Sequence, residues 1–452
     1  MTKNCVCIVH CVDTEGPMNE SLDATFGRLK TIFGIKLEPS KENLQKLQRQ
    51  EIDLQGCEAE VADVISVKRL NMNRDWTAVD TMLDEILSER YRMVLPDSRG
   101  KGWTYSWFCM DHVGFTGNNP RRRDAGYHNI HDHYHARLQA PECMGDGLYF
   151  HYHPLPFSGD YNLSATAYVA GKNLFEILSR RIIDRGFFPS VYRPGFHTER
   201  PDSHWFLEQW IPFDYANQAC DEAETAQRDM VSGRYGDWRR APREWRPYHP
   251  SHDDYQRPGA CHRWITRCLN MDARIRTLDQ SEVDAAFILA RAEGKSILAF
   301  TNHDFRDMRG EIARVREMIA LSAEKYPDVQ FVYCNALEAM RRYLGVEAEG
   351  IGMNVSIHKR DSASTMVQIT SERSIFGSQP FFAIKTKSGQ YFWDNLDRGM
   401  DENEWSYAFD ANTFVADAIE KIGVAANSVS GVGEIVVCDF VKGMSEKHIL
   451  NP

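Results

Sequence analysis

Short apolar runs alternate with amphipathic stretches along the first three quarters of the chain. The apolar runs are rich in β-branched and aromatic residues and predict strands at residues 5–11, 105–110, 147–150, 189–193, 296–301 and 329–333. Apolar residues at helical spacing predict helices at residues 75–93, 164–185, 280–293, 310–325 and 336–344. Strands that alternate with such helices are typical of parallel β/α units, so the pattern predicts an α/β fold, a (β/α) barrel.

The pattern changes after Gly345. Residues 351–410 alternate apolar and polar positions, a helix is expected at about 412–421, and a final strand is expected near 434–440. These features predict a small, β-rich accessory domain of the sandwich type. The chain is therefore expected to form two domains, a barrel at 1–345 and a C-terminal β domain at 346–452.

Polar residues suited to catalysis directly follow the predicted strands. They are Asp13, Asp111, His151, Arg193 and His303. In a (β/α) barrel the carboxyl ends of the strands share one face, and that face holds the active site. Any strand can end in one polar residue, but this succession predicts a common site.

Two motifs at these strand ends predict a metal site. In an extended chain, residues two apart point to the same side, so His151 and His153 share a side, as do Asp13 and Glu15. Two imidazoles and a carboxylate form a ligand set for one divalent metal ion, zinc first and otherwise iron, cobalt or nickel. The alternatives are hydrogen-bonded histidines at the barrel rim and a solvated turn at Asp13-Thr14-Glu15.

The order of these motifs resembles that of the polysaccharide deacetylases of the NodB type. The motifs are Val12-Asp13-Thr14-Glu15, His151-Tyr152-His153-Pro154, Tyr192-Arg193-Pro194-Gly195, Pro212-Phe213-Asp214-Tyr215 and Phe300-Thr301-Asn302-His303. The resemblance covers about residues 4–344 and implies a distorted, NodB-like (β/α) barrel. It also implies a metal-dependent amidohydrolase that removes an N-acyl group, acetyl or formyl, from an amino sugar.

The resemblance implies a role for each matching residue. These roles are general base for Asp13, metal ligand for Glu15, His151 and His153, orientation of Asp13 for Arg193, general acid for His303, and a further catalytic role for Asp214. The commoner family pattern has two adjacent aspartates and a His-x-x-x-His pair, whereas this chain has Asp-x-Glu and His-x-His. The departure leaves open whether Asp13 itself binds the metal and whether the barrel is catalytic.

Further polar and aromatic residues are candidates for substrate binding. Four histidines lie within residues 128–135, and within a polar and aromatic loop at about 218–259 the segment around 234–265 interleaves aromatic rings with arginines. The predicted substrate contacts are Asp111, His112, Arg121, His131, His135, Trp238 and Trp245. The alternatives are a second metal site in the histidine cluster, a solvated basic loop, and a lid that packs its rings on the barrel.

Composition narrows the class of protein. Of 452 residues, 42% are apolar and 26% charged, as in globular proteins, and 53 Lys and Arg against 64 Asp and Glu give a net charge of −11. An acidic chain without a Lys/Arg tract is a poor candidate for binding nucleic acid. No apolar run reaches the length of a membrane span, and the first residues lack the order of a signal peptide.

The cellular compartment expected from the cysteines helps to predict the substrate. Eleven cysteines without a framework spacing indicate reduced thiols, which predicts a cytoplasmic protein. For a cytoplasmic deacylase we expect a nucleotide- or lipid-linked amino sugar that is destined for a surface polysaccharide such as an O-antigen or capsule. The alternatives are an inactive barrel that binds a glycan or a partner enzyme, and hydrolysis of a small linear or cyclic amide.

Overall fold

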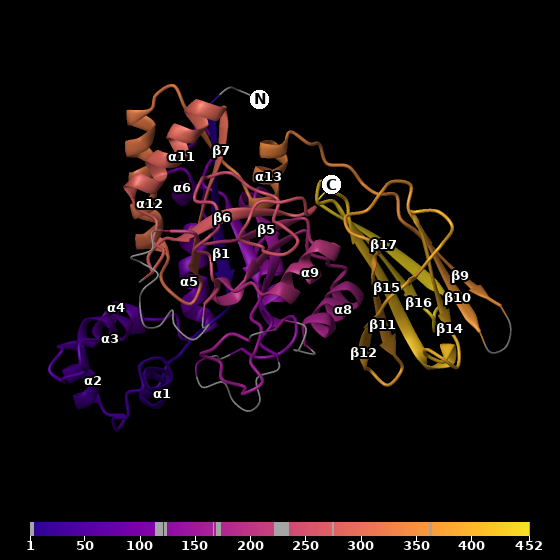
Figure 1. Ribbon diagram of the computed structural model, residues 1–452, viewed down its shortest axis with the longest axis horizontal. Helices are drawn as coiled ribbons and strands as arrows, with labels where there is room; N and C mark the ends of the chain where they lie inside the picture. Colours follow the sequence, from indigo (N-terminus) through magenta and orange to yellow (C-terminus); the bar gives the residue numbers. More distant parts are fainter. Residues whose placement is uncertain are drawn as a thin grey trace.

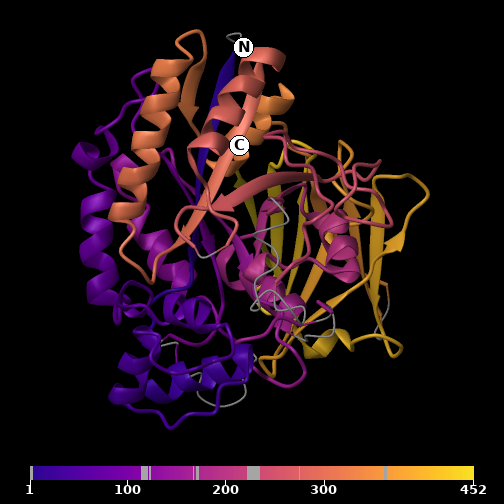
Figure 2. The same ribbon diagram turned by 60° about the vertical axis from the view of Figure 1, so that its left-hand side comes forward.

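A parallel barrel is built around the first strand of the chain (Figures 1 and 2). The computed structural model describes residues 4–113, 121, 124–165, 167–168, 173–220, 235–273, 275–360 and 364–451. In this part of the chain, seven parallel strands from β1 to β7 close into a barrel, and β8 adds to the first half of β1. The strands are β1 (Cys5–Thr14), β2 (Tyr105–Cys109), β3 (Gly147–Tyr152), β4 (Val191–Pro194), β5 (Phe213–Asn217), β6 (Trp264–Asn270), β7 (Lys295–His303) and β8 (Gln330–Tyr333).

Helices surround the barrel (Figure 1). On one side lie α5 (Trp76–Ile86), α6 (Glu89–Arg92), α11 (Gln280–Glu293) and α12 (Arg309–Lys325), and on the other α8 (Asn173–Arg185) and α9 (Pro201–Trp210). The helix α7 (Asn129–Arg137) packs near β2, and α13 (Ala336–Leu344) lies at the end where the strands begin. At the opposite end of the barrel lie α1 (Leu22–Phe33), α2 (Lys41–Gln48), α3 (Glu58–Val64) and α4 (Val67–Leu70).

Both edges of β1 are paired. One edge pairs with β7 from Cys5 to Asp13. The other edge pairs with β8 over residues 5–8 and with β2 over residues 10–14. The barrel therefore closes through β1.

Side chains of β1 alternate between the inside and the outside of the barrel. Cys7, Val9 and Cys11 point inward and join an apolar cluster to which all the barrel strands and α13 contribute. The even-numbered apolar residues of β1 point outward and pack with α5, α11 and α12. Because the alternation continues, Asp13 takes the next inward position, at the carboxyl end of the barrel.

Most predicted helices and strands of the barrel are confirmed, with differences at their ends. The helix predicted at 75–93 is two helices, because the Ser88 side chain accepts a hydrogen bond from the Tyr91 amide and caps a new helix, α6. Of the helix predicted at 164–185, the described part is α8 (Asn173–Arg185), and the described residues between 164 and 168 are not helical. The helices α1 to α4 and α9 and the strands β5 and β6 were not predicted.

The C-terminal region contains two antiparallel sheets packed face to face. In its described residues, β9 (Asn354–Lys359), β10 (Thr365–Thr370), β13 (Asp397–Arg398) and β14 (Glu404–Phe409) form one sheet. The other is formed by β11 (Phe381–Thr386), β12 (Tyr391–Asp394), β15 (Ile419–Asn427), β16 (Gly433–Asp439) and β17 (Met444–Leu450). Apolar residues from both sheets share one core. The prediction of a β-rich region is confirmed.

Two predictions within this region are wrong. The helix expected at about 412–421 is only a 3₁₀ turn at Ala416–Ala418, and β15 begins at the next residue. Ile419 and Ile422 are buried in the core between the sheets, and backbone pairing of β15 with β11 and β16 holds this segment extended. The strand near 434–440 is not the last, because β17 follows it.

The outer face of the five-stranded sheet packs on the barrel helix α8. Phe381 and Ala425 of the sheet share an apolar cluster with Leu178 and Ile182 of α8. The buried Asn427 side chain also donates hydrogen bonds of 2.8 Å to two barrel carbonyls, those of Pro189 and Trp210. The sheet is thereby fixed to the barrel by both apolar and polar contacts.

His10 should make stability depend on pH. It is buried, its Nε2 lies 2.9 Å from Asn302 Oδ1, and burial lowers the pKa of the imidazole to about 3. In the unfolded chain the His10 imidazole binds a proton below about pH 6.5, whereas in the folded chain it stays neutral. The free energy of unfolding should therefore fall by about 1.4 kcal/mol per pH unit below that value. Urea unfolding at several pH values should show a shallower slope in His10→Gln and an unchanged slope in His135→Gln, whose side chain is exposed. An identical slope in His10→Gln would contradict this assignment.

None of the described helices combines the length and the apolar character that crossing a membrane requires.

Candidate metal centre

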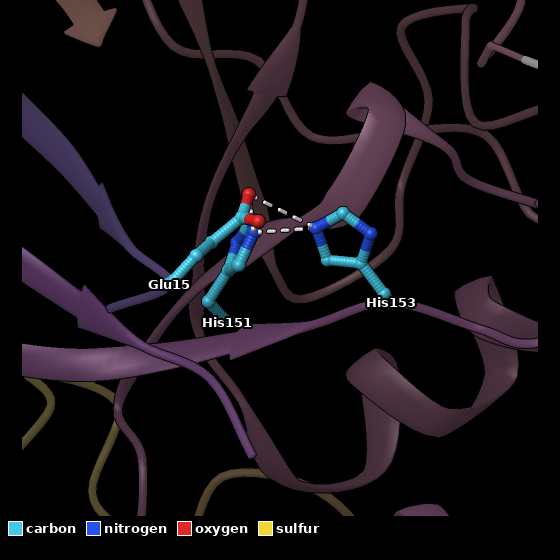
Figure 3. Close-up of side chains that lie close together, drawn as sticks. All are labelled: Glu15, His151 and His153. Carbon is cyan, nitrogen blue, oxygen red and sulfur yellow. Dashed lines mark hydrogen bonds and ion pairs between the residues drawn. The ribbon is translucent and has the colours of Figure 1, made fainter. Parts of the chain in front are cut away.

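Glu15, His151 and His153 converge at the carboxyl end of the barrel (Figure 3). Glu15 follows β1, His151 lies in β3 and His153 follows that strand. The two Nε2 atoms lie 3.1 Å apart, and Glu15 Oε1 lies 3.3 Å from His153 Nε2 and 3.8 Å from His151 Nε2. Among the described residues, these three form a group of potential ligands whose atoms lie close enough together for one ion.

The donor atoms fit a metal ion in both spacing and protonation. With metal–nitrogen distances of about 2.0–2.1 Å, the ligand atoms of a tetrahedral site lie about 3.3 Å apart, near the observed separations. His151 Nδ1 donates a hydrogen bond of 2.8 Å to the Arg193 carbonyl, which leaves the lone pair of Nε2 directed at the group. The cluster can therefore hold a metal ion, although its geometry does not select one metal.

Asp13 lies next to this group, and an ion pair with Arg193 holds it in place. The guanidinium donates to both carboxylate oxygens, at 2.6 Å from Nε and 3.1 Å from Nη2, and both side chains are buried. Burial alone would raise the pKa of Asp13, but Arg193 and the nearby His151 and His303 outweigh burial and hold that pKa well below its usual range. Asp13 lies on the Nδ1 side of His151, 3.7 Å away, and outside the ligand group on the Nε2 side.

His303 ends β7 and pairs in register with Asp13 of β1. Its Nε2 is 3.7 Å from Asp13 Oδ2 and 3.7 Å from Glu15 Oε1. Burial lowers the pKa of His303 to about 3, and Asp13 offsets only part of this effect. The imidazole is therefore neutral at neutral pH, and it must first receive a proton before it can donate one.

Asp304 positions the ligand loop, although no role was predicted for it. Its carboxylate accepts hydrogen bonds from the amides of Glu15 at 2.9 Å and Gly16 at 3.0 Å. The Tyr134 hydroxyl donates to the same carboxylate at 2.8 Å. Tyr134 belongs to α7, so the histidine-rich helix supports the site through its tyrosine.

The turn after β4 holds an unusual backbone conformation. Phe196 and His197 have φ angles of 52° and 49°, in the left-handed region that non-glycine residues rarely adopt. Arg193 donates to His197 Nδ1 at 3.0 Å, and the Trp238 indole donates to the His197 carbonyl at 2.7 Å. Contacts from distant segments therefore fix this strained turn beside the candidate ligands.

A cavity of about 180 Å³ opens above the group. Of the predicted site residues, it is lined by Asp13, Glu15, His112, Arg121, His151, His153 and His303. His112 also hydrogen-bonds to the Glu15 carbonyl at 2.9 Å through Nε2. Lining residues that were not predicted include Arg69, Phe196, His197, Tyr235, Phe305 and Arg306.

The other predicted substrate contacts do not line this cavity. Asp111 is buried in an ion pair with Arg181 at 3.1 Å, and Trp238 is buried beneath the turn after β4. Trp245 lies at the far end of the barrel, where its carbonyl accepts a hydrogen bond from the Ile297 amide near the start of β7. In α7, His131 is buried beside Phe187 and His135 is exposed.

Asp214 lies outside the barrel, away from the candidate metal centre. It pairs in register with Tyr192, whose side chain belongs to the outer cluster around α8, whereas Tyr215 belongs to the inner cluster. Burial and the neighbouring Glu199 raise the pKa of Asp214, and Arg263 Nε lies 3.8 Å from its carboxylate. The Asp214 side chain therefore does not contact the site in which a catalytic role was expected for it.

Replacing Gly195 by alanine should weaken metal binding. A Cβ atom at this position would lie 2.1 Å from His153 Cδ2, so the imidazole would have to move. Loss of correct ligand orientation typically lowers metal affinity by about 10–100-fold. Competition with a chromogenic chelator would measure the change, with Gly310→Ala as control because no atom lies within 4 Å of its Cβ position. Equal affinities in Gly195→Ala and the wild type would contradict the assignment of His153 as a ligand.

The arrangement combines a candidate ligand set, a buried carboxylate–guanidinium pair and a neutral histidine around one cavity. Such a set can polarise a carbonyl group, accept a proton from water and return a proton to a leaving group. The chain matches no protein-family model, no curated protein and no solved structure.

Proposed function

We propose that this protein is a metal-dependent amidohydrolase of the NodB polysaccharide deacetylase type, which removes an acetyl or formyl group from the nitrogen of an amino sugar. The observation that carries the proposal is the convergence of Glu15, His151 and His153 with the Asp13–Arg193 pair at the carboxyl end of a parallel barrel. His303 faces the same cavity. The motifs that supply these residues follow one another in the order typical of that family.

In the proposed hydrolysis of the amide, the residues around the cavity have different roles. Glu15, His151 and His153 would hold a divalent metal ion, which would supply Lewis-acid polarisation of the acyl carbonyl and of water. Arg193 keeps Asp13 ionised and fixed in position. His112 and Asp304 restrain the backbone at Glu15, so that its carboxylate is held before the substrate arrives.

Proton transfer falls to Asp13 and His303. Both groups are unprotonated at neutral pH, so either can accept the proton that water releases when it attacks the carbonyl. Asp13 Oδ2 and His303 Nε2 are 3.7 Å apart, beyond direct hydrogen-bond reach, so we propose that one bridging water passes the proton between them. His303 then donates this proton to the departing nitrogen, and the products are an amine and acetic or formic acid, which loses its proton to solvent at neutral pH.

Aromatic rings in the cavity suit a sugar. Phe196, Tyr235 and Phe305 line it, and the rings of Phe196 and Tyr235 meet edge to face at 5.7 Å. Apolar ring faces pack against the carbon–hydrogen faces of a pyranose while the polar residues bind its hydroxyl groups. We propose a nucleotide- or lipid-linked amino sugar for surface polysaccharide synthesis as the substrate.

Release of the acyl group tests this function. Zinc-, iron-, cobalt- and nickel-loaded proteins are incubated with N-acetylglucosamine, its N-formyl analogue and the UDP-linked forms, and free acetate, formate and amine are measured. His303→Ala should lower kcat about 10²–10⁴-fold, and His135→Ala should leave it unchanged. Sugar binding without acyl release by any metal form would favour the inactive, glycan-binding alternative.

A further inference from the structure

Three arginines line the cavity that holds the candidate metal centre. Arg69 lies on α4, Arg121 in the loop before α7, and Arg306 follows β7. Phe305 packs with Met18 and Met72, which ties the segment that bears α1 to α4 to the turn after β7. Guanidinium groups from three distant parts of the chain are thus held around one space.

Arg121 shares a buried carboxylate with a second arginine, and Arg69 lies near a half-exposed one. Glu20 Oε2 lies 2.9 Å from Arg121 Nε, but Glu20 Oε1 lies 2.8 Å from the guanidinium of Arg28, so two cations share one buried carboxylate. Arg69 has a looser pairing, with its Nε 3.8 Å from Asp63 Oδ1. The carboxylate of Asp63 is about half exposed, so solvent weakens that pair.

Arg306 has no acidic partner within the described residues. Its Nε is buried and makes no hydrogen bond there, and its guanidinium lies 5.3 Å from the Phe305 ring centroid. Burial lowers the pKa of Arg306 to about 10, and repulsion from Arg69, Arg121 and Arg28 adds to the effect although Glu311 opposes it. The fold therefore places at the cavity a partly buried guanidinium that forms no ion pair with the described residues.

We propose that Arg69, Arg121 and Arg306 form a subsite for an anionic oxygen group of the substrate, a phosphate or a carboxylate. Guanidinium groups bind both through pairs of charge-assisted hydrogen bonds. The subsite shares its cavity with Glu15, His151 and His153, so the anion lies on the same small molecule as the scissile amide. This link to the amide rests on the proposed function, whereas anion binding itself does not.

Calorimetric titration of the metal-free protein tests the subsite directly. The His151→Ala/His153→Ala variant removes the candidate metal ligands, so that an anion cannot bind through a metal. Methyl phosphate and acetate are titrated separately into this variant and into versions that also carry Arg306→Gln or Arg69→Gln. Arg314→Gln is the matched control, because Arg314 is exposed on α12 and does not line the cavity.

We expect saturable binding of at least one of the two anions. Arg306→Gln and Arg69→Gln should each weaken it about tenfold or more, whereas Arg314→Gln should change it less than about twofold. Tighter binding of methyl phosphate indicates a phosphorylated or nucleotide-linked substrate, and tighter binding of acetate indicates an acidic sugar. Arg306→Gln should also melt at the same temperature or higher, because it removes repulsion among the arginines.

Two results would overturn the subsite. One is the absence of saturable binding of either anion, and the other is binding that Arg306→Gln and Arg69→Gln leave unchanged. Failure of the amidohydrolase assay would not affect this titration, because it requires neither metal nor turnover. The subsite and the proposed function can therefore fail separately.

Discussion

Replacing His151 and His153 together by alanine should remove about one bound divalent metal ion per chain. The two imidazoles supply two of the three candidate donor atoms, and a single carboxylate does not retain a transition metal ion in competition with water. Elemental analysis of protein purified without chelator, before and after reconstitution with zinc, measures the loss. Amide hydrolysis should disappear with the ion.

The matched control is His131→Ala/His135→Ala. It also removes two imidazoles, whose rings are stacked with centroids 5.8 Å apart, but in α7 and away from the cavity. This variant should keep the metal content of the wild type. Metal that persists in His151→Ala/His153→Ala and disappears from the control would place the ion in the histidine-rich helix. A wild-type protein that takes up no metal on reconstitution would refute the metal centre altogether.

Arg193→Met should lower the free energy of unfolding by about 3–5 kcal/mol. The substitution keeps much of the side-chain volume but leaves Asp13 buried without its counter-ion, and it removes the hydrogen bond of 2.8 Å to the Tyr215 carbonyl. An uncompensated buried charge is far more costly than the loss of a solvated pair. Urea unfolding at neutral pH measures the difference.

Arg309→Met is the matched control for this loss. Arg309 pairs with Asp307 at 2.7 Å and with Glu85 at 2.5 Å, but all three side chains are about 40% exposed or more, so we expect a cost of about 0–1 kcal/mol. The difference between the two variants in free energy of unfolding should become smaller at acidic pH. Because its folded pKa is depressed, Asp13 contributes stability above its unfolded pKa of about 3.9, and this contribution is lost as the pH falls below that value. Equal costs for the two substitutions at neutral pH would contradict the buried ion pair.

Backbone periodicity explains why the core of the candidate site could be predicted from the sequence. The strands β1 and β3 extend further than their apolar runs, so the period of two that orients their inward residues applies to Asp13 and His151. This period is a local property of extended chain and needs no knowledge of distant contacts. The carboxyl ends of parallel strands then bring the two motifs together.

The same alternation of side chains excludes Asp214 from the candidate site once the strand β5 is recognised. That strand has five residues, two of them polar, and gives no clear apolar pattern, so it was not predicted. Its alternation places Tyr215 inside the barrel and Asp214 outside. A short motif match therefore does not show which way a side chain points unless the strand that contains the motif is also recognised.

Tertiary contacts determine the remaining features of the site. The rings of Trp238 and Trp245 and the histidines of α7 suggested a binding surface by composition alone, but packing buries most of them away from the cavity. Asp304 holds Glu15 through contacts with α7 and β1, and no local pattern reveals this role. Arg69 reaches the cavity through the helices α1 to α4, which lack a clear signal in the sequence.

The pairing of β1 has a consequence for how the protein is made. Cys5 pairs with Lys295 and with Gln330, so one edge of β1 lacks its partner β7 until about 290 further residues have been synthesised, and residues 5–8 of the other edge wait still longer for β8. At about 5–20 residues per second, that wait lasts tens of seconds, during which an apolar strand with open edges is exposed to aggregation. Barrel closure must therefore be a late event, and chaperone capacity during synthesis should limit the yield of folded protein.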